Sequence, residues 1–325
     1  MNKEWLNEIE QAIKSLDLPV LPDTLYEPFR YTMAMGGKRI RPYLTLLSCG
    51  MVSGNHTLAL PSALSVEILH NFTLVHDDIM DEADTRRGIA CVHKKWDSNI
   101  AILSGDVMYA YAFKQLLSYR ESSKLEKEQF AELLQTFVDS TIKVCDGQAL
   151  DMEFMERSEV SVEDYFEMIE GKTGALLAGA LAMGAIVGGR SDLKERMTRL
   201  GNLMGVAFQI QDDLLDIIAE PEDFGKKKAG DIREGKKTYL WLRTFMECTV
   251  KERNHMLEVY NHDELTDEQV HTIISMMEKY GIIEETSELI DNKYRQIYDI
   301  IGEFEESIYR TELSRLIDYL RSRIK

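Results

Sequence analysis

The sequence predicts an all-helical protein, on three observations. Apolar residues recur at intervals of three and four through most of the chain, which is the helical period, as in Leu64, Ile68, Leu69 and Phe72. No convincing run of residues with the alternation of a strand is present. The 325 residues include 6 Pro and 20 Gly, so there is room for long helices.

The spacing of the breaks predicts a single helical domain over residues 1–325. The breaks are short, and none resembles an interdomain linker: they fall at residues 51–55, 85–88, 190–192 and 221–235. Length alone does not force two domains. The residues after about Lys251 form amphipathic helical patterns without a chemical motif, so we assign them to the scaffold.

The composition excludes several classes of protein. The formal charge of -18 would repel a phosphate backbone, so we expect no nucleic-acid partner. The cysteines lie far apart without a Cys-x-x-Cys pair, which argues against a zinc site and a disulfide framework. The N-terminal residues are amphipathic and acidic, unlike a signal peptide. We therefore expect a cytoplasmic protein.

The first chemical motif is a basic loop, Gly36 to Pro42, with the sequence GGKRIRP. Its glycines allow a ligand to approach the backbone, and Lys38, Arg39 and Arg41 cluster beside them. In an acidic protein such a cluster suggests a small anionic ligand, for example a diphosphate. The alternative, for this motif alone, is an ordinary basic loop.

The next element is a predicted helix that ends in LVHDDIMD, residues 74–81. Asp77 and Asp81 are four residues apart and so lie on one helix face, with Asp78 beside them. His70 lies seven residues before Asp77, almost on the same face. A lone histidine in this position would more often be a core residue.

Further basic residues follow this acidic motif. Arg86 and Arg87 precede a glycine, and guanidinium groups can bind phosphate oxygens in pairs. Lys172 and Thr173 lead into the longest apolar run, residues 174–189, although both could be ordinary residues at a helix start. This run is shorter than the roughly 18 to 20 residues of a membrane span, so we predict a tightly packed central helix instead. Its small side chains would let a helix or a substrate tail approach closely.

The acidic pattern occurs a second time, in FQIQDDLLDI at residues 208–217. Asp212 and Asp216 repeat the spacing, with Asp213 alongside. Burying such carboxylates is costly unless a cation compensates. Asp oxygens without His or Cys suit Mg²⁺, which completes its shell with water and phosphate oxygens. One copy alone would be a solvated helix face more often than a site, but two copies indicate a metal site.

Residues 220–237 form the largest polar stretch, rich in Gly and Lys, directly after the second acidic motif. This placement predicts a mobile lid. Lys226, Lys236 and Lys237 would carry its positive charge, although each could also be a plain solvated lysine.

Taken in order, these motifs resemble those of the trans-prenyl diphosphate synthases. The resemblance rests on GGKRIRP, LHNFTLVHDDIMDEADTRRG, GQALD, EGKTGAL, FQIQDDLLDI and DIREGKKT, and it spans about Arg30 to Leu240. It implies an antiparallel helical bundle with a deep central cavity, of the isoprenoid synthase type. It also implies a homodimer, with the two aspartate motifs facing each other across the cavity mouth.

The resemblance implies a role for each site residue. The Mg²⁺ ligands, for about three ions, would be Asp77, Asp81 and Asp212. Supports or additional ligands, the last two through water, would be Asp78, Asp213 and Asp216. The allylic diphosphate would contact Arg86, Lys172, Lys226 and Lys236. The isopentenyl diphosphate would contact the loop at Gly37 and the side chains of Lys38, Arg41, His70 and Arg87. Facing the reacting carbons would be Thr173 and Gln209.

The implied reaction joins isopentenyl diphosphate head-to-tail to dimethylallyl, geranyl or farnesyl diphosphate. Mg²⁺ and cationic side chains would stabilise the departing diphosphate, so that the allylic C–O bond ionises. The double bond of isopentenyl diphosphate would attack the resulting cation. The released diphosphate would take the final proton, and a closing lid would exclude water.

The product length is predicted from the residues before the first acidic motif. Phe72 lies about 7 to 8 Å from Asp77 along the helix, where a bulky side chain could be the floor for a growing tail or simple core packing. In the family, one aromatic residue at this position, the small Thr73 next to it and no insertion within the first acidic motif resemble the archaeal-type geranylgeranyl synthases. Leu69 continues the stripe. We expect a C20 product, with C15 next.

Other functions remain as alternatives. A class I terpene cyclase or a squalene-type synthase also uses facing acidic helices, but neither needs the basic motifs that would hold isopentenyl diphosphate. A regulatory subunit of a heteromeric synthase would be expected to have lost its aspartate motifs, and this chain retains both.

Overall fold

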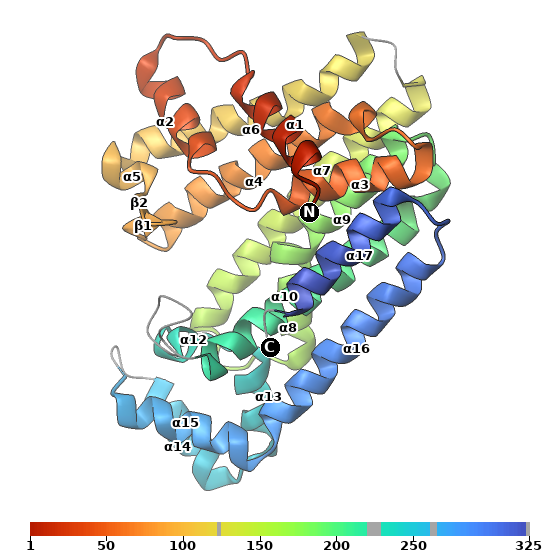
Figure 1. Cartoon of the computed structure of the whole chain (residues 1–325). Coiled ribbons are helices and arrows are strands. Elements are labelled where there is room, and N and C mark those ends of the chain that lie inside the picture. The colour runs from red at the N-terminus through yellow and green to blue at the C-terminus, as the bar shows by residue number, and fades with distance from the viewer. Residues whose placement is uncertain (122–124, 220–228, 261–264, 323–325) are drawn as a thin grey trace. The chain divides into compact units, whose positions relative to one another are not determined.

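The computed structural model describes residues 1–121, 125–219, 229–260 and 265–322, and this part of the chain is almost entirely helical (Figure 1). The predicted all-α class is confirmed. A short antiparallel strand pair, which the sequence did not predict, joins β1 (Thr85–Arg86) to β2 (Ile89–Ala90). It lies at the break expected around residues 85–88, so that this break is a tight hairpin.

The chain divides into two compact units, which are described separately. Unit 1 contains residues 1–139, 176–198 and 304–316, and unit 2 contains residues 140–175, 199–303 and 317–325. The single domain expected over residues 1–325 stays a prediction.

Unit 1 contains the N-terminal helices and the middle of the chain. Its N-terminal helices are α1 (Lys3–Lys14), α2 (Asp23–Ala34), α3 (Ile40–Ser53), η1 (His56–Ala59), α4 (Leu60–Met80), α5 (Val92–Lys95) and α6 (Ser98–Glu121). It also holds the first part of α7 (Lys127–Glu156), most of α9 (Ala175–Val187), η3 (Ser191–Leu193), and parts of α10 (Lys194–Ile218) and α17 (Ile308–Arg321). Helix α4 packs along α6 and against α3.

The Gly- and Ala-rich run forms the buried helix α9, as predicted. The Ser48 hydroxyl of α3 donates to the Leu181 carbonyl of α9 at 2.5 Å. A side chain at Gly184 would collide with the Thr45 carbonyl and with Ser48. The small residues of α9 therefore let the backbone of α3 approach closely, and larger side chains would separate the two helices.

Unit 2 contains the remaining helices. They are α8 (Val162–Ile169), the π-helical turn η2 (Glu170–Gly174), α12 (Gly230–Arg233), α13 (Tyr239–Glu247), α14 (Val250–Tyr260), α15 (Asp267–Lys279) and α16 (Ile282–Gly302), with the remainders of α7, α10 and α17. The buried Gln211 of α10 accepts a hydrogen bond from the Tyr294 hydroxyl at 2.6 Å and donates to the Leu320 carbonyl at 2.9 Å. This network fixes α10, which carries the second aspartate motif, against α16 and α17.

Among the described residues, two stretches are long and apolar enough to cross a membrane, residues 56–80 and 162–187. Burial inside the protein covers 61% and 83% of their apolar windows, as in core helices. Their length and composition are weak evidence for a span, and the expected absence of a span stays a prediction.

Candidate functional site

The first aspartate motif lies at the C-terminal end of α4. Asp78 is 4% exposed, and its carboxylate accepts hydrogen bonds from the Arg86 guanidinium at 2.6 and 2.7 Å. Asp81 caps the helix and is exposed, one turn from Asp77. The central carboxylate therefore holds Arg86 in place, while Asp77 and Asp81 share the other helix face.

The three basic residues of the loop GGKRIRP have different environments. Arg39 is 4% exposed and pairs with Glu67 and with Glu10, at 2.5 and 2.8 Å. Lys38 is exposed at the surface, and Arg41 turns toward His70 in the middle of α4. Arg39 therefore belongs to the internal packing of unit 1, which the sequence did not indicate.

His70 and Arg41 form the centre of a cationic cluster in unit 1. A guanidinium nitrogen of Arg41 lies 3.2 Å from His70 Nε2. Since a guanidinium can only donate, Nε2 accepts and the ring proton is on Nδ1. Burial, and then the charges of Arg41 and its neighbours, hold the pKa of His70 well below 6.5. Burial also lowers the pKa of Arg41 to about 10.

Arg87 closes this cluster against the glycine loop. Its guanidinium donates to the Gly36 carbonyl, and a side chain on Gly37 would lie 2.9 Å from the guanidinium nitrogens. Gly37 also has a φ of 144°, in the region that favours glycine. The group that approaches the backbone of this loop closely is therefore the Arg87 guanidinium. Five residues assigned to substrate binding meet in this part of unit 1: Gly37, Arg41, His70, Arg86 and Arg87.

The second aspartate motif lies on α10 in unit 2. Asp213 is 4% exposed, accepts from the Tyr165 hydroxyl at 2.6 Å, and accepts from the Gln209 amide at 3.0 Å. Burial, and then the charge of Asp231, raise the pKa of Asp213 to about 7. The Gln209 carbonyl oxygen in turn accepts from the Thr173 hydroxyl at 3.0 Å. A chain of hydrogen bonds thus fixes the amide of Gln209.

Asp216 supports the C-terminal part of the predicted lid, which the structure describes from residue 229. Its two carboxylate oxygens accept from the backbone N–H groups of Gly230 and Asp231, at 3.1 and 3.0 Å. Asp212 is half-buried on the same helix. Asp213 and Asp216 are therefore held by protein groups.

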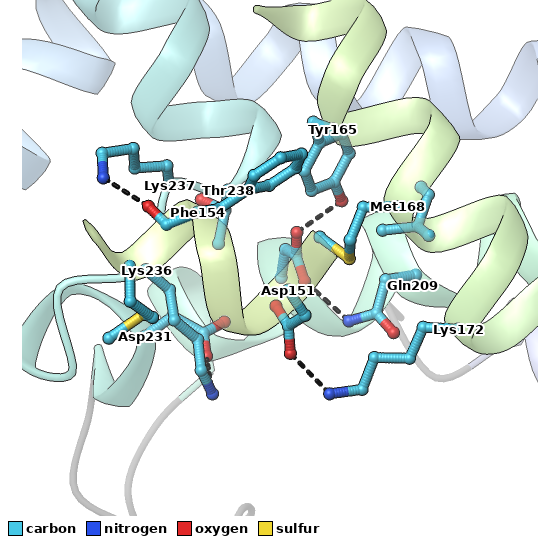
Figure 2. A pocket seen from close by; sticks show the side chains of 13 residues that line it. Asp151, Phe154, Tyr165, Met168, Lys172, Gln209, Asp231, Lys236, Lys237 and Thr238 are labelled. Atoms are coloured by element: carbon cyan, nitrogen blue, oxygen red, sulfur yellow. Dashed lines mark hydrogen bonds and ion pairs between the residues drawn. The ribbon is translucent and has the colours of Figure 1, made fainter. Parts of the chain in front are cut away.

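A pocket in unit 2 opens beside the second motif (Figure 2). Lys172 points to Asp151 and pairs with it at 2.5 Å, and Lys236 pairs with Glu234 at 2.6 Å and Asp231 at 3.4 Å. The pocket is lined by cations, carboxylates and the apolar groups of Phe154 and Met168. Lys226, which was predicted to contribute to the same task, lies outside the described residues.

Aromatic side chains follow the residues predicted to set product length. The Phe72 ring lies 4.7 Å from the His76 ring and 5.7 Å from the Tyr109 ring, and Tyr109 stacks on Phe137 at 6.2 Å. Leu69 is buried, and the Thr73 hydroxyl donates to the His70 carbonyl at 2.9 Å. Phe72 therefore belongs to an aromatic row that runs from α4 through α6 to α7.

Comparisons with known proteins give the family. The polyprenyl synthetase family matches residues 22–277. The chain belongs to this family.

Relatives of similar length include the geranylgeranyl diphosphate synthase of Methanosarcina mazei, 36% identical over 325 residues, with 99% of this chain and 96% of the relative covered. The short chain isoprenyl diphosphate synthase of Methanothermobacter thermautotrophicus is 36% identical over 322 residues, with 99% and 97% covered. A solved structure of geranylgeranyl pyrophosphate synthetase from Pyrococcus horikoshii has a TM-score of 0.91 at 35% identity, with 99% and 97% covered.

The donor set of this polyprenyl synthetase fits a hard divalent ion. Asp77, Asp81 and Asp212 offer carboxylate oxygens, the ligands that Mg²⁺ prefers. Among the residues that the structure describes, no group of three or more His, Cys, Asp or Glu forms a protein-only metal cage. Each motif alone offers the one or two carboxylates that Mg²⁺ needs from a protein, because this ion keeps water and phosphate oxygens as its other ligands.

The structure adds residues of this polyprenyl synthetase that sequence reasoning missed. Asp151 pairs with Lys172, Asp231 with Lys236, Tyr165 with Asp213, and Tyr109 contacts Phe72. Asp151 was within the quoted motif GQALD, and Asp231 within DIREGKKT. Tyr165 and Tyr109 had no signal in the sequence, since neither belongs to one of the motifs.

Proposed function

We propose that this polyprenyl synthetase is a Mg²⁺-dependent trans-prenyltransferase that joins isopentenyl diphosphate head-to-tail to an allylic diphosphate. The observation that carries the proposal is that both aspartate motifs are complete and that each central carboxylate is buried and held by protein groups. The names of the relatives agree with this activity. A regulatory subunit would have no need for either motif.

The allylic diphosphate would be held by the aspartate motifs and the cations beside them. Asp77, Asp81 and Asp212 would hold Mg²⁺, which, when bound, supplies positive charge to the departing diphosphate. Asp78 would position Arg86, and Asp213 would position Gln209. Lys172 and Lys236 are already paired with carboxylates, so a bound diphosphate would share or replace these partners.

The isopentenyl diphosphate would bind at the cationic cluster in unit 1. The lowered pKa values of Arg41, Arg87 and His70, attributed first to burial and also to neighbouring cations, indicate crowded positive charge. An anion would relieve that repulsion, which supports a diphosphate site here. Lys38 and the backbone at Gly37 would complete it.

Thr173 and Gln209 of unit 2 would act on the reacting carbons. Thr173 and Gln209 are linked by a hydrogen bond, so their oxygen atoms would be directed together at the developing allylic cation. The released diphosphate would accept the final proton, and no side-chain base is needed. Lys226 would add charge from the predicted lid.

We infer a C20 product, geranylgeranyl diphosphate, with Phe72 as the floor and Leu69 and Thr73 beside it. The contact of Phe72 with Tyr109 supports this, because a ring braced by a second ring resists displacement by a growing tail. Phe72→Ala should shift the products beyond C20, while Phe72→Tyr, which keeps the ring, should still stop at C20. Mass spectrometry of the products distinguishes the two, and an unchanged distribution in Phe72→Ala would remove Phe72 as the floor.

The active form would be a homodimer in the cytoplasm. Ile102, Leu103 and Leu117 of α6 are exposed at 44%, 54% and 36%, an apolar set that a second copy would cover. Light scattering of the purified protein tests this, with Leu103→Glu expected to shift the mass toward that of one chain.

The decisive experiment is incubation of the purified protein with Mg²⁺, isopentenyl diphosphate and, separately, dimethylallyl, geranyl and farnesyl diphosphates. Elongation that stops at C20 is expected, and chelation of the metal with EDTA should abolish it. Cyclic hydrocarbons would point to a terpene cyclase instead. No elongation with any starter, in a folded protein, would favour the regulatory subunit.

A further inference from the structure

Two glycines of unit 2 bring helix backbones into direct contact on either side of η2, the π-helical turn that carries Lys172 and Thr173. A methyl group added at Gly147 of α7 would lie less than 3.0 Å from the Lys172 nitrogen and the Gly171 carbonyl carbon. A methyl group added at Gly205 of α10 would lie less than 3.0 Å from the Gly174 backbone. No larger residue fits at either contact without moving the turn, because the obstructing atoms are backbone and cannot rotate away.

Each of the two glycines is followed, four residues later on its helix, by a side chain that binds a residue of the turn. Asp151 lies four residues after Gly147, and its carboxylate accepts a hydrogen bond from the Lys172 ammonium at 2.5 Å. Gln209 lies four residues after Gly205 and accepts the Thr173 hydroxyl at 3.0 Å. Residues four apart on a helix share a face, so each backbone contact and each side-chain contact lie one turn apart on the same helix.

The turn itself has an unusual geometry. Residues Glu170–Gly174 form a π-helical turn between α8 and α9, a rare widening of the helix that is often found at functional sites. Gly147 supports it from α7 and Gly205 from α10.

From this geometry we infer that Gly147 and Gly205 are positioning residues, which set the places of Lys172 and Thr173 relative to Asp151 and Gln209. The inference rests on the proposed function, in which Lys172 holds diphosphate and Thr173 faces the reacting carbons. An added methyl group would have to push the turn away from α7 or α10. A displacement of about 1 Å can lower the rate of an enzyme about 100-fold.

The glycines of the turn provide a graded series for the test. A methyl group at Gly171 would meet the Gly147 Cα at 2.8 Å and the Lys143 carbonyl at 2.9 Å, a collision with the same contact from the other side. A methyl group at Gly174 would find its nearest atoms at 3.5 Å, an ordinary contact. Gly174→Ala is therefore a matched control, which adds a methyl group to the same turn without a collision with a neighbouring helix.

The experiment compares Gly147→Ala, Gly205→Ala, Gly171→Ala and Gly174→Ala, at a temperature where circular dichroism shows each to be folded. In the first three, kcat/KM for the allylic diphosphate should fall about 100-fold, while the KM for isopentenyl diphosphate should stay within about two-fold, since its cluster is in unit 1. Gly174→Ala should stay close to the wild type. If Gly147→Ala does not fold, Gly171→Ala tests the same contact.

A readout without turnover separates this inference from the proposed function. Inorganic pyrophosphate with Mg²⁺ should raise the melting temperature of the wild type and of Gly174→Ala, and should raise that of Gly171→Ala by less, because Lys172 is displaced. An active wild type with unchanged kinetics and an unchanged pyrophosphate shift in Gly171→Ala and Gly205→Ala would overturn the inference alone. In Gly171→Ala, a loss of kcat/KM with an unchanged pyrophosphate shift would also overturn it, because Lys172 would then not have been displaced. An inactive wild type would instead refute the proposed function.

Discussion

The two aspartate motifs have the same spacing but hold their central carboxylates in different ways. At the end of α4, Asp78 forms an ion pair with the Arg86 guanidinium. On α10, Asp213 accepts hydrogen bonds from two neutral groups, the Tyr165 hydroxyl and the Gln209 amide. The first motif therefore fixes a cation, and the second fixes an amide.

The surroundings of the motifs explain this difference. The helix of the first motif also carries His70, whose pKa is lowered by burial and then by four arginines, whereas the second motif has Asp231 as a neighbour, which helps to raise the pKa of Asp213. A sequence pattern of five residues thus sets which carboxylates share a face, but the charge that surrounds them comes from other parts of the fold.

The largest expected effect tests what the motifs share. Asp77→Asn and Asp212→Asn should each lower kcat by at least about 10²–10³-fold, because each replaces a proposed metal-ligating carboxylate with a neutral group of the same shape. Steady-state assays at saturating Mg²⁺ measure this, with the melting temperature as the control for folding. Full activity in either variant would mean that the two motifs do not both hold the metal.

The next effect separates the central residues. Asp78→Asn should lower the free energy of unfolding by about 2 kcal/mol, since it leaves the largely buried Arg86 guanidinium without its carboxylate. The partial solvent exposure of Arg86 keeps this loss below that of a fully buried ion pair. Asp213→Asn has neutral partners and should cost less than about 1 kcal/mol. Chemical denaturation at pH 7 compares them, and equal costs would mean that the two environments are not energetically distinct.

The last aspartate of each motif provides a comparison of similar size. Asp216→Ala removes two hydrogen bonds from the backbone at Gly230 and Asp231 and should cost about 1 to 2 kcal/mol of unfolding free energy. Asp81→Ala, at an exposed position, should stay within about 0.5 kcal/mol of the wild type. The same denaturation experiment tests the pair, and a larger loss in Asp81→Ala would reverse this assignment.

The smallest effect concerns the cationic surroundings of the first motif. Because the pKa of His70 is lower in the folded protein than its ordinary 6.5, the unfolded chain binds more protons in acid, and stability should be lost as the pH falls below 6.5. One such group contributes at most about 1.4 kcal/mol per pH unit. His70→Gln should reduce this loss between pH 7 and 5.5, whereas the surface control His255→Gln should not. Identical pH profiles for wild type and His70→Gln would contradict it.

The helices and the acidic motifs could be predicted because their signals are local. Asp77 with Asp81, and Asp212 with Asp216, share a face through helix geometry alone, and the small residues of α9 indicate close packing wherever the helix lies. The resemblance to the motifs of a known family then indicated the function of these residues.

Other features depend on contacts between segments far apart in the sequence. Arg39 was grouped with Lys38 and Arg41, but the buried Glu67 withdraws it from the ligand site. The role of Tyr165 depends on the contact between α8 and α10, which the sequence does not show. The π-helical turn at Lys172 has no sequence pattern that distinguishes it from an α-helix. The roles of such residues depend on tertiary contacts, which a local sequence pattern does not show.

The buried Arg39 has a consequence for where the folding unit begins. One of its two carboxylate partners is Glu10 of α1, although the family match starts at residue 22. Expression of the matched region alone would remove that partner, together with both rings of the Trp5–Tyr309 stack. Affinity tags on this protein should therefore extend its first helix and not replace it.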